Sequence, residues 1–165
     1  MHTDFISQGE IFNMRTLIVY FSKFGNTHQI ADTIAGTLAQ QVNVTTIDFD
    51  HLTLDHLVDL DLLVMGSPTH IMNLPKTVMP VFENFPKHTL PGTPVAAFDT
   101  SYKMSWMLNQ FTAAKHLARK LRKIGGKVLL PPEIFLVTGR EGPLVEGELE
   151  RAEQWAETLW TKLDN

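Results

Sequence analysis

The segment Ser22–Thr27 combines hydroxyl and amide side chains with a glycine. It follows an apolar run typical of a buried strand and precedes residues with helical spacing. Unpaired N–H groups at the start of a helix, together with the positive end of the helix dipole, attract anions such as phosphate. Ser22, Asn26 and Thr27 can add side-chain donors to such a site. An equally open interpretation is structural, because Ser22 or Asn26 can simply cap the helix.

Several other chemistries lack their residue patterns. The loop contains neither G-x-x-x-x-G-K-[ST] nor G-x-G-x-x-G, the patterns of two common nucleotide-binding loops. The chain has no cysteine, which excludes a disulfide scaffold, a thiol nucleophile and a cysteine-bound metal. His51 and His56 are five residues apart, a spacing that does not put two metal ligands on one helix face. The sequence contains no G-x-S-x-G segment, the pattern that would predict a serine nucleophile.

Composition narrows the class of protein. The 165 residues are 44% hydrophobic and 19% charged, as expected for one globular domain. The formal net charge of −4 disfavours broad nucleic-acid binding. The apolar runs are far shorter than the roughly 20 residues of a membrane span, so we expect a cytoplasmic protein without membrane partners. Residues 1–13 do not resemble a signal peptide, and we expect a loosely ordered extension before a domain at residues 14–165.

Strand-like and helix-like patterns alternate along the chain. Apolar or alternating runs predict strands at residues 16–21, 42–49, 61–66 and 94–98, and a fifth strand in two pieces, 127–130 and 134–137, around Pro131-Pro132. Apolar residues three and four apart predict helices around residues 30–38, 54–58, 75–85, 109–124 and 145–163, the third one bent at Pro80. Five strand–helix units predict an α/β domain with a parallel sheet and helices on both faces.

Ligands of such sheets lie at the carboxyl ends of the strands. This rule directs attention to four loops: Ser22–Thr27, Ser67–Asn73, Asp99–Trp106 and Thr138–Pro143. In the fourth, Arg140 and Glu141 lie on the ligand side of the sheet, but a solvated turn is the favoured interpretation.

The first loop carries a family resemblance. Tyr20-Phe21-Ser22-Lys23-Phe24-Gly25-Asn26-Thr27 resembles the FMN phosphate loop of flavodoxins, roughly [TS]-x-[TS]-G-x-T, at Ser22, Gly25 and Thr27. Phe24 stands where the family has its middle hydroxyl. The resemblance extends from about Thr16 to Leu163, and it implies a single doubly wound five-stranded parallel sheet of order 2-1-3-4-5.

The resemblance also implies which residues contact the cofactor. The expected set is Ser22, Lys23, Phe24, Gly25, Asn26 and Thr27 in the first loop, Ser67, Pro68, Thr69, His70 and Ile71 in the second, and Asp99, Thr100, Ser101, Tyr102 and Trp106 in the third. The first loop would bind the phosphate. Ile71 or Met72 would cover one face of the flavin, and Tyr102, or else Trp106, would stack on the other, since flat aromatic rings stack well. Core packing of Trp106 is an equally open interpretation.

Asp99 calls for a separate interpretation. A receiver domain of signalling systems has the same strand order but requires an acidic pair after the first strand and an aspartate after the third. This chain has Phe21-Ser22 and Gly66-Ser67 at those places, so it is not predicted to be a receiver. We therefore expect Asp99 to be a loop or turn residue, or a polar neighbour of the flavin edge.

The resemblance, taken with the lack of a dedicated acid, base or nucleophile, predicts a protein that binds FMN and carries electrons between redox partners. A small FMN-dependent NAD(P)H:quinone-type reductase is one alternative. A non-redox interaction domain that has lost FMN is another, suggested by Phe24 and a third loop without glycine. The basic run Lys115–Lys123 is interpreted mainly as a solvated helix face, with docking of an acidic redox partner as the functional alternative.

Overall fold

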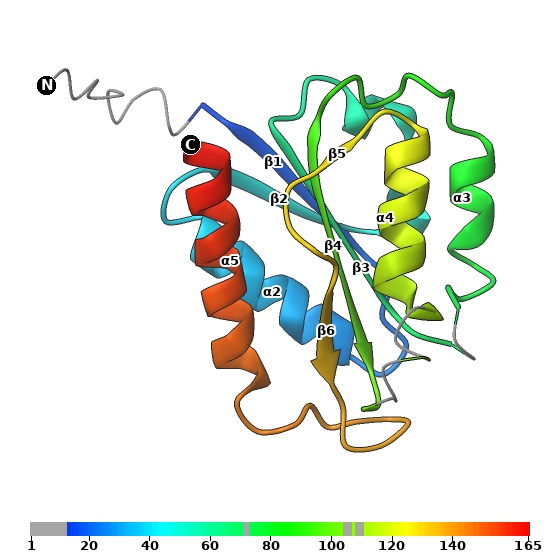
Figure 1. Cartoon of the computed structure of the whole chain (residues 1–165), viewed down its shortest axis with the longest axis vertical. Coiled ribbons are helices and arrows are strands. Elements are labelled where there is room, and N and C mark those ends of the chain that lie inside the picture. The colour runs from blue at the N-terminus through cyan, green and yellow to red at the C-terminus, as the bar shows by residue number, and fades with distance from the viewer. Residues whose placement is uncertain (1–12, 71–72, 104–106, 108–110) are drawn as a thin grey trace, which may run out of the picture.

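A computed structural model describes residues 13–70, 73–103, 107 and 111–165. Its strands are β1 (Arg15–Tyr20), β2 (Asn43–Asp48), β3 (Leu62–Pro68), β4 (Pro94–Ser101), β5 (Lys127–Val128) and β6 (Glu133–Leu136). Its helices are α2 (Asn26–Leu38), α3 (Met79–Glu83), α4 (Ala113–Lys123) and α5 (Glu148–Asp164), with short 3-10 turns at Phe49–His51 and Leu54–Leu57. The sheet is parallel, in the order β2-β1-β3-β4-β5 (Figure 1). The predicted doubly wound fold and strand order are confirmed.

The fifth position of the sheet is filled by two short strands. β5 pairs with the start of β4, where Lys127 lies opposite Pro94, and β6 pairs with its end, where Glu133 lies opposite Phe98. Pro131 and Pro132 lie between them, and proline has no N–H to give to a ladder. The split predicted from these two prolines is therefore confirmed.

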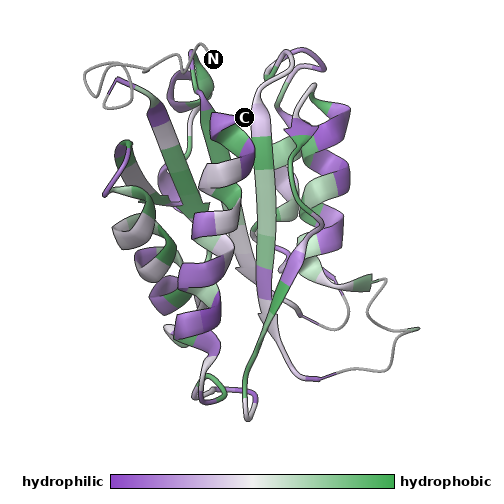
Figure 2. Cartoon of the chain, turned by 60° about the vertical axis from the view of Figure 1, so that its left-hand side comes forward, coloured by the Kyte–Doolittle hydropathy of each residue, from purple (hydrophilic) through white to green (hydrophobic). Residues whose placement is uncertain are grey.

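Both faces of the sheet are covered by helices. In β1, Leu17 and Val19 join the core beneath α3 and α4, whereas Ile18 joins the core beneath α2 and α5. This alternation explains why the central strands read as continuous apolar runs. Figure 2 shows hydrophobic residues concentrated on the strands and hydrophilic residues on the outward faces of the helices.

Two strands are longer than the sequence patterns predicted. β3 does not stop at Gly66 but continues through Pro68, which lies opposite Thr100. Beyond Gly66, β3 pairs only with β4, so a proline is tolerated there. β4 continues past Phe98 to Ser101. These extensions bring polar residues into the end of the sheet. The prediction that Asp99 is a loop or turn residue is wrong, because Asp99 lies within β4.

Three helices are shorter than predicted. α3 covers only Met79–Glu83, and Pro80 lies in its first turn, where proline is tolerated, instead of bending its interior. α4 begins at Ala113, after Thr112 in extended conformation. α5 begins at Glu148 because Val145 still donates its N–H to the Leu136 carbonyl.

Within the described residues, no helix is long and apolar enough to cross a membrane. The extension predicted at residues 1–13 lies outside the described part of the chain except for Asn13. The domain boundary at residue 14 therefore stays a prediction.

Candidate functional site

A cavity of about 420 Å³ opens at the carboxyl ends of the central strands. Among the predicted cofactor-binding residues, it is lined by Ser22, Lys23, Phe24, Asn26, Thr27, Pro68, Thr69, His70, Thr100, Ser101 and Tyr102. Three segments far apart in the sequence thus share one cavity. Its volume is within the usual range for small-molecule sites, roughly 300–1,000 Å³.

The remaining predicted residues fall into two groups. Gly25, Ser67 and Asp99 are described but do not line the cavity. Ser67 is fully buried and its hydroxyl donates to the Pro68 carbonyl at 3.0 Å. Ile71, the alternative Met72, and Trp106 lie outside the described residues.

Of the described residues that line the cavity, six were not in the predicted set: Phe21, Pro75, Lys76, Thr77, Val137 and Arg140. Phe21 and Val137 are the residues that follow β1 and β6, so the rule that ligands bind at strand ends could have identified them. Arg140 belongs to a loop that the same rule singled out, although a solvated turn was the favoured interpretation. Pro75–Thr77 were not predicted as ligand contacts because the predicted helix began at Pro75, whereas α3 begins at Met79.

The first loop leads directly into α2. Gly25 has a φ of 92°, a left-handed conformation that favours glycine, and it turns the chain into the helix. The Ser22 Oγ accepts hydrogen bonds from the N–H groups of Gly25 at 3.1 Å and His28 at 3.3 Å. Ser22 therefore satisfies two N–H groups at the helix start, as the structural interpretation of this residue predicted, while also lining the cavity.

Asn26 and Thr27 link α2 to neighbouring segments. The Asn26 side chain donates to the Glu141 carbonyl at 3.1 Å, and so it does not cap the helix. The Thr27 hydroxyl lies 2.8 Å from the hydroxyl of Thr100, and Thr27 is almost fully buried. No described residue accepts the backbone N–H of Asn26 or Thr27. The start of α2 therefore presents donors in the cavity wall.

The end of β4 is tied to the start of α4. The Asp99 carboxylate, which is fully buried, accepts the N–H of Ala114 at 2.9 Å and the hydroxyl of Ser101 at 3.2 Å. The Thr69 hydroxyl accepts the N–H of Ala113 at 2.9 Å. Burial raises the pKa of Asp99 to about 6, against the lowering effect of the Ala114 N–H. Asp99 thus anchors the helix behind the cavity.

The cavity wall is cationic. Lys23, Lys76 and Arg140 line it, and no Asp or Glu is among the described lining residues. The Lys23 ammonium lies 5.4 Å from the centre of the Phe24 ring, close enough for a cation–π contact. This pattern contrasts with the net charge of −4 of the whole chain. Three cations and no carboxylate among the lining residues that the structure describes favour an anionic ligand.

Two aromatic rings lie at the edge of the cavity. Phe24 is 42% exposed and Tyr102 is 47% exposed, although both line the cavity wall. Their exposed faces can stack on a flat ligand. Among the described residues, no group of three or more His, Asp or Glu side chains could hold a metal ion.

Comparison with known proteins identifies relatives of this chain. A family model of the flavodoxin domain matches residues 17–132. A flavodoxin from the domain Archaea superposes with a TM-score of 0.73 at 23% identity, over 92% of this chain and all of the other. Flavodoxin 2 from Bacillus cereus gives 0.75 at 22% identity, over 90% and 99% of the two chains.

A WrbA-like flavodoxin from Agrobacterium tumefaciens gives a TM-score of 0.69 at 18% identity, over 92% of this chain and 98% of the other. No curated protein sequence matches the chain. Because the identities with these solved structures are below 25%, the superpositions establish a shared fold.

Proposed function

This chain belongs to the flavodoxin domain family, and from that premise we propose that its cavity binds FMN and that the protein carries electrons between redox partners. The observation that carries the proposal is the chemistry of the cavity wall. Backbone donors at the start of α2 and three cations meet there without a carboxylate among the described lining residues.

The residues present fit the phosphate of FMN at the first loop. The N–H groups of Asn26 and Thr27 have no partner among the described residues, and the hydroxyls of Ser22 and Thr27 adjoin them. Helix N-termini of this kind bind phosphate groups. Lys23 and Arg140 add positive charge to the same wall. Phe24 in place of a third hydroxyl removes one donor but leaves this set intact.

The residues also fit the flavin ring at the second and third loops. Pro68 ends β3 and Ser101 ends β4, and Thr69, His70 and Tyr102 are in the loops that follow, so a flat ligand between the two loops meets both. We expect Tyr102 to stack on the ring from the outside. Bound FMN supplies the electron chemistry, and the chain controls access to the ring and the polarity around it.

A carrier is favoured over an enzyme with its own substrate site. The cavity volume of about 420 Å³ is in the range of pockets that hold one drug-sized ligand, so bound FMN would leave little room for a second substrate. The small NAD(P)H:quinone-type reductase is the second candidate, because a cationic wall that includes Lys76 and Arg140 also suits the phosphates of a nicotinamide nucleotide. A domain that has lost FMN would account for neither the cations nor the unpaired donors.

The proposal is tested by the absorbance spectrum and turnover of the purified protein. We expect flavin absorbance bands at about 370 and about 450 nm in the protein as purified or after loading with FMN. These bands are intrinsic to the cofactor. We also expect no turnover of NADH or NADPH with a quinone beyond that of free FMN. Rapid turnover would establish the reductase instead, and the absence of flavin bands after loading would leave an interaction domain.

A further inference from the structure

The positive charge of this acidic chain is concentrated in one segment. From Thr100 to Pro132 the sequence has seven Lys or Arg residues and no Asp or Glu, although the whole chain has 14 basic and 18 acidic residues. Five of the seven are on α4, and we call them the basic face: Lys115, Arg119, Lys120, Arg122 and Lys123. A local excess of this size creates a positive field on an otherwise negative protein.

The geometry of α4 turns this charge outward. Ala114, Leu117, Ala118 and Leu121 are buried against the sheet, whereas Arg119, Arg122 and Lys123 are exposed. Positions 115, 119 and 122 follow the i, i+4, i+7 spacing of one helix face.

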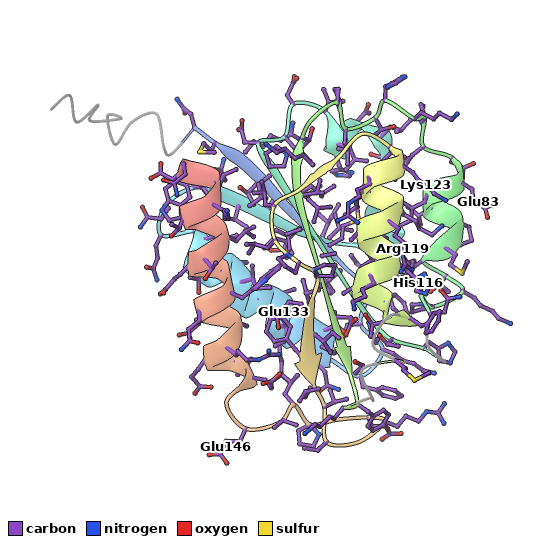
Figure 3. All side chains as sticks on the ribbon, in the orientation of Figure 1. Glu83, His116, Arg119, Lys123, Glu133 and Glu146 are labelled. Atoms are coloured by element: carbon purple, nitrogen blue, oxygen red, sulfur yellow. The ribbon has the colours of Figure 1, made fainter. Side chains whose placement is uncertain are left out.

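On the side of α4 that faces α3, other groups partly offset the positive charge. The Lys120 ammonium lies 5.7 Å from the centre of the Phe82 ring of α3, so its stem packs between the helices. Figure 3 shows Glu83 of α3 on the same side of the molecule as His116, Arg119 and Lys123. The five cations of the basic face keep the net charge of α4 positive, because this helix contains no Asp or Glu.

The basic face adjoins the mouth of the cavity. The N–H of Ala113, the first residue of α4, donates to the hydroxyl of Thr69 in the cavity wall. Phe111 just before the helix is 50% exposed, and Tyr102 at the cavity edge is 47% exposed. Eleven residues of helix span about 16 Å. The cations, the apolar edge and the cavity mouth therefore fit within one protein interface of ordinary size, about 800 Å² per partner.

We propose that the basic face docks an acidic protein that carries a one-electron redox centre, and that docking brings this centre to the cavity mouth. The inference rests on the proposed function, because a flavin must be present to exchange the electron. In each encounter the partner's centre loses one electron and is oxidised, the flavin gains it and is reduced, and solvent supplies any proton.

A protein fits this surface better than a membrane or a nucleic acid. Aromatic residues and Arg are enriched in protein interfaces, and this surface combines the exposed Phe111 and Tyr102 with the two arginines of α4. Outside Thr100–Pro132 the chain has seven basic and eighteen acidic residues, which would repel an extended anionic surface. Opposite charge over a compact area instead speeds encounter with an acidic protein of similar size.

Titration of the FMN-loaded, 15N-labelled protein with an oxidised [2Fe–2S] ferredoxin of net negative charge tests the docking. At about 0.02 M ionic strength we expect amide shifts in α4 and around Tyr102, which disappear at about 0.3 M as salt screens the charges. Basic cytochrome c, the probe of opposite charge, is expected to produce no shifts there.

A matched pair of variants tests the residues. We expect Lys115→Gln/Arg122→Gln to weaken ferredoxin binding roughly fivefold, as two modest surface interactions are lost. Lys87→Gln/Lys162→Gln removes the same charge from exposed sites outside α4, and Lys162 lies in the last turn of α5 as Arg122 does in α4. We expect this control to bind ferredoxin within about twofold of the native chain.

Stopped flow measures the rate at which reduced ferredoxin reduces the flavin. We expect this rate to fall in Lys115→Gln/Arg122→Gln and to change little in the control Lys87→Gln/Lys162→Gln. Equal ferredoxin binding by the two variants, or tighter binding of cytochrome c, would overturn the proposal. Binding of anionic phosphatidylserine vesicles through α4 without binding of ferredoxin would overturn it in favour of a membrane surface. Failure to load FMN would refute the proposed function, and with it the redox meaning of docking, whereas loading without docking would refute only this inference.

Discussion

The carboxylate of Asp99 in β4 accepts the backbone N–H of Ala114 in α4 at 2.9 Å. A residue from the end of a strand thus caps a helix that begins 14 residues later in the chain, in place of the local Thr112, which makes no such bond. The bond fixes α4, and with it the basic face, beside the residues that line the cavity.

This buried carboxylate gives stability a specific dependence on pH. Burial raises the pKa of Asp99 to about 6 in the folded chain, above its ordinary value of 3.8. The folded state therefore binds the proton more tightly than the unfolded state, and stability from this group is full below about pH 4 and lost as pH rises through 6. Asp99→Asn keeps an oxygen to accept the Ala114 N–H but cannot ionise.

We expect the free energy of unfolding of the variant to exceed that of the native chain by a margin that grows with pH. The margin should be roughly 2–3 kcal/mol larger at about pH 7.5 than at about pH 4. Urea unfolding of both proteins at the two pH values measures the difference. If the gap between them is the same at both, Asp99 does not titrate as described.

Thr27→Val tests the phosphate assignment. The change removes a hydroxyl that lies 2.8 Å from that of Thr100 and that we propose to contact the phosphate. We expect FMN affinity to fall about tenfold, and stability to fall by about 1 kcal/mol because Thr100 loses its partner. Thr33→Val is the control, since its hydroxyl bonds only the Gln29 carbonyl on the exposed side of α2. Unchanged FMN affinity in Thr27→Val would remove this residue from the site.

Gly25→Ala separates backbone strain from loss of binding. Gly25 and Gly92 both have positive φ values, 92° and 70°, and both have open space where a Cβ would lie. We expect either alanine substitution to cost about 1–2 kcal/mol of stability. Because Gly25 lies in the loop that we propose to bind phosphate, we expect Gly25→Ala alone to weaken FMN binding, measured by titration of each variant. A matching loss in Gly92→Ala would show that the effect is global.

Tyr102 is expected to stack on the flavin. Its ring is 47% exposed at the cavity edge, and stacking of flat rings adds about 0.5–1.5 kcal/mol beyond buried area. We therefore expect Tyr102→Ala to change the absorbance spectrum of bound FMN and weaken its affinity, and Tyr102→Phe to retain both. Identical spectra for the alanine variant and the native chain would contradict stacking by this residue.

Local patterns predicted the architecture because they reflect burial directly. The run from Leu17 to Val19 alternates between two cores, and this requires a strand covered on both faces. The length of β4 could not be predicted in the same way. Asp99 is polar and so suggests the end of a strand, but its partner Ala114 comes from a distant helix. Its burial is decided by a tertiary contact that no local window contains.

The same distinction applies to the cavity. Ser22 to Thr27 stood out because hydroxyls and glycine adjoin a strand end. Lys76 gave no such signal, because it follows Pro75 at what looked like the start of a helix. Arg140 was within a loop that strand order had selected, but its charge alone did not distinguish a ligand contact from a solvated turn. Only the arrangement of three cations around one cavity indicates an anionic ligand.

The most direct test of the central claim is titration of the protein with FMN, followed by flavin fluorescence, with riboflavin in parallel. Binding at the start of α2 predicts saturable FMN quenching with a Kd of about 1 μM or tighter. It also predicts at least about tenfold weaker binding of riboflavin, because the phosphate-free ligand cannot use the N–H groups of Asn26 and Thr27. Equal affinity for the two ligands, or no saturable quenching, would contradict the account.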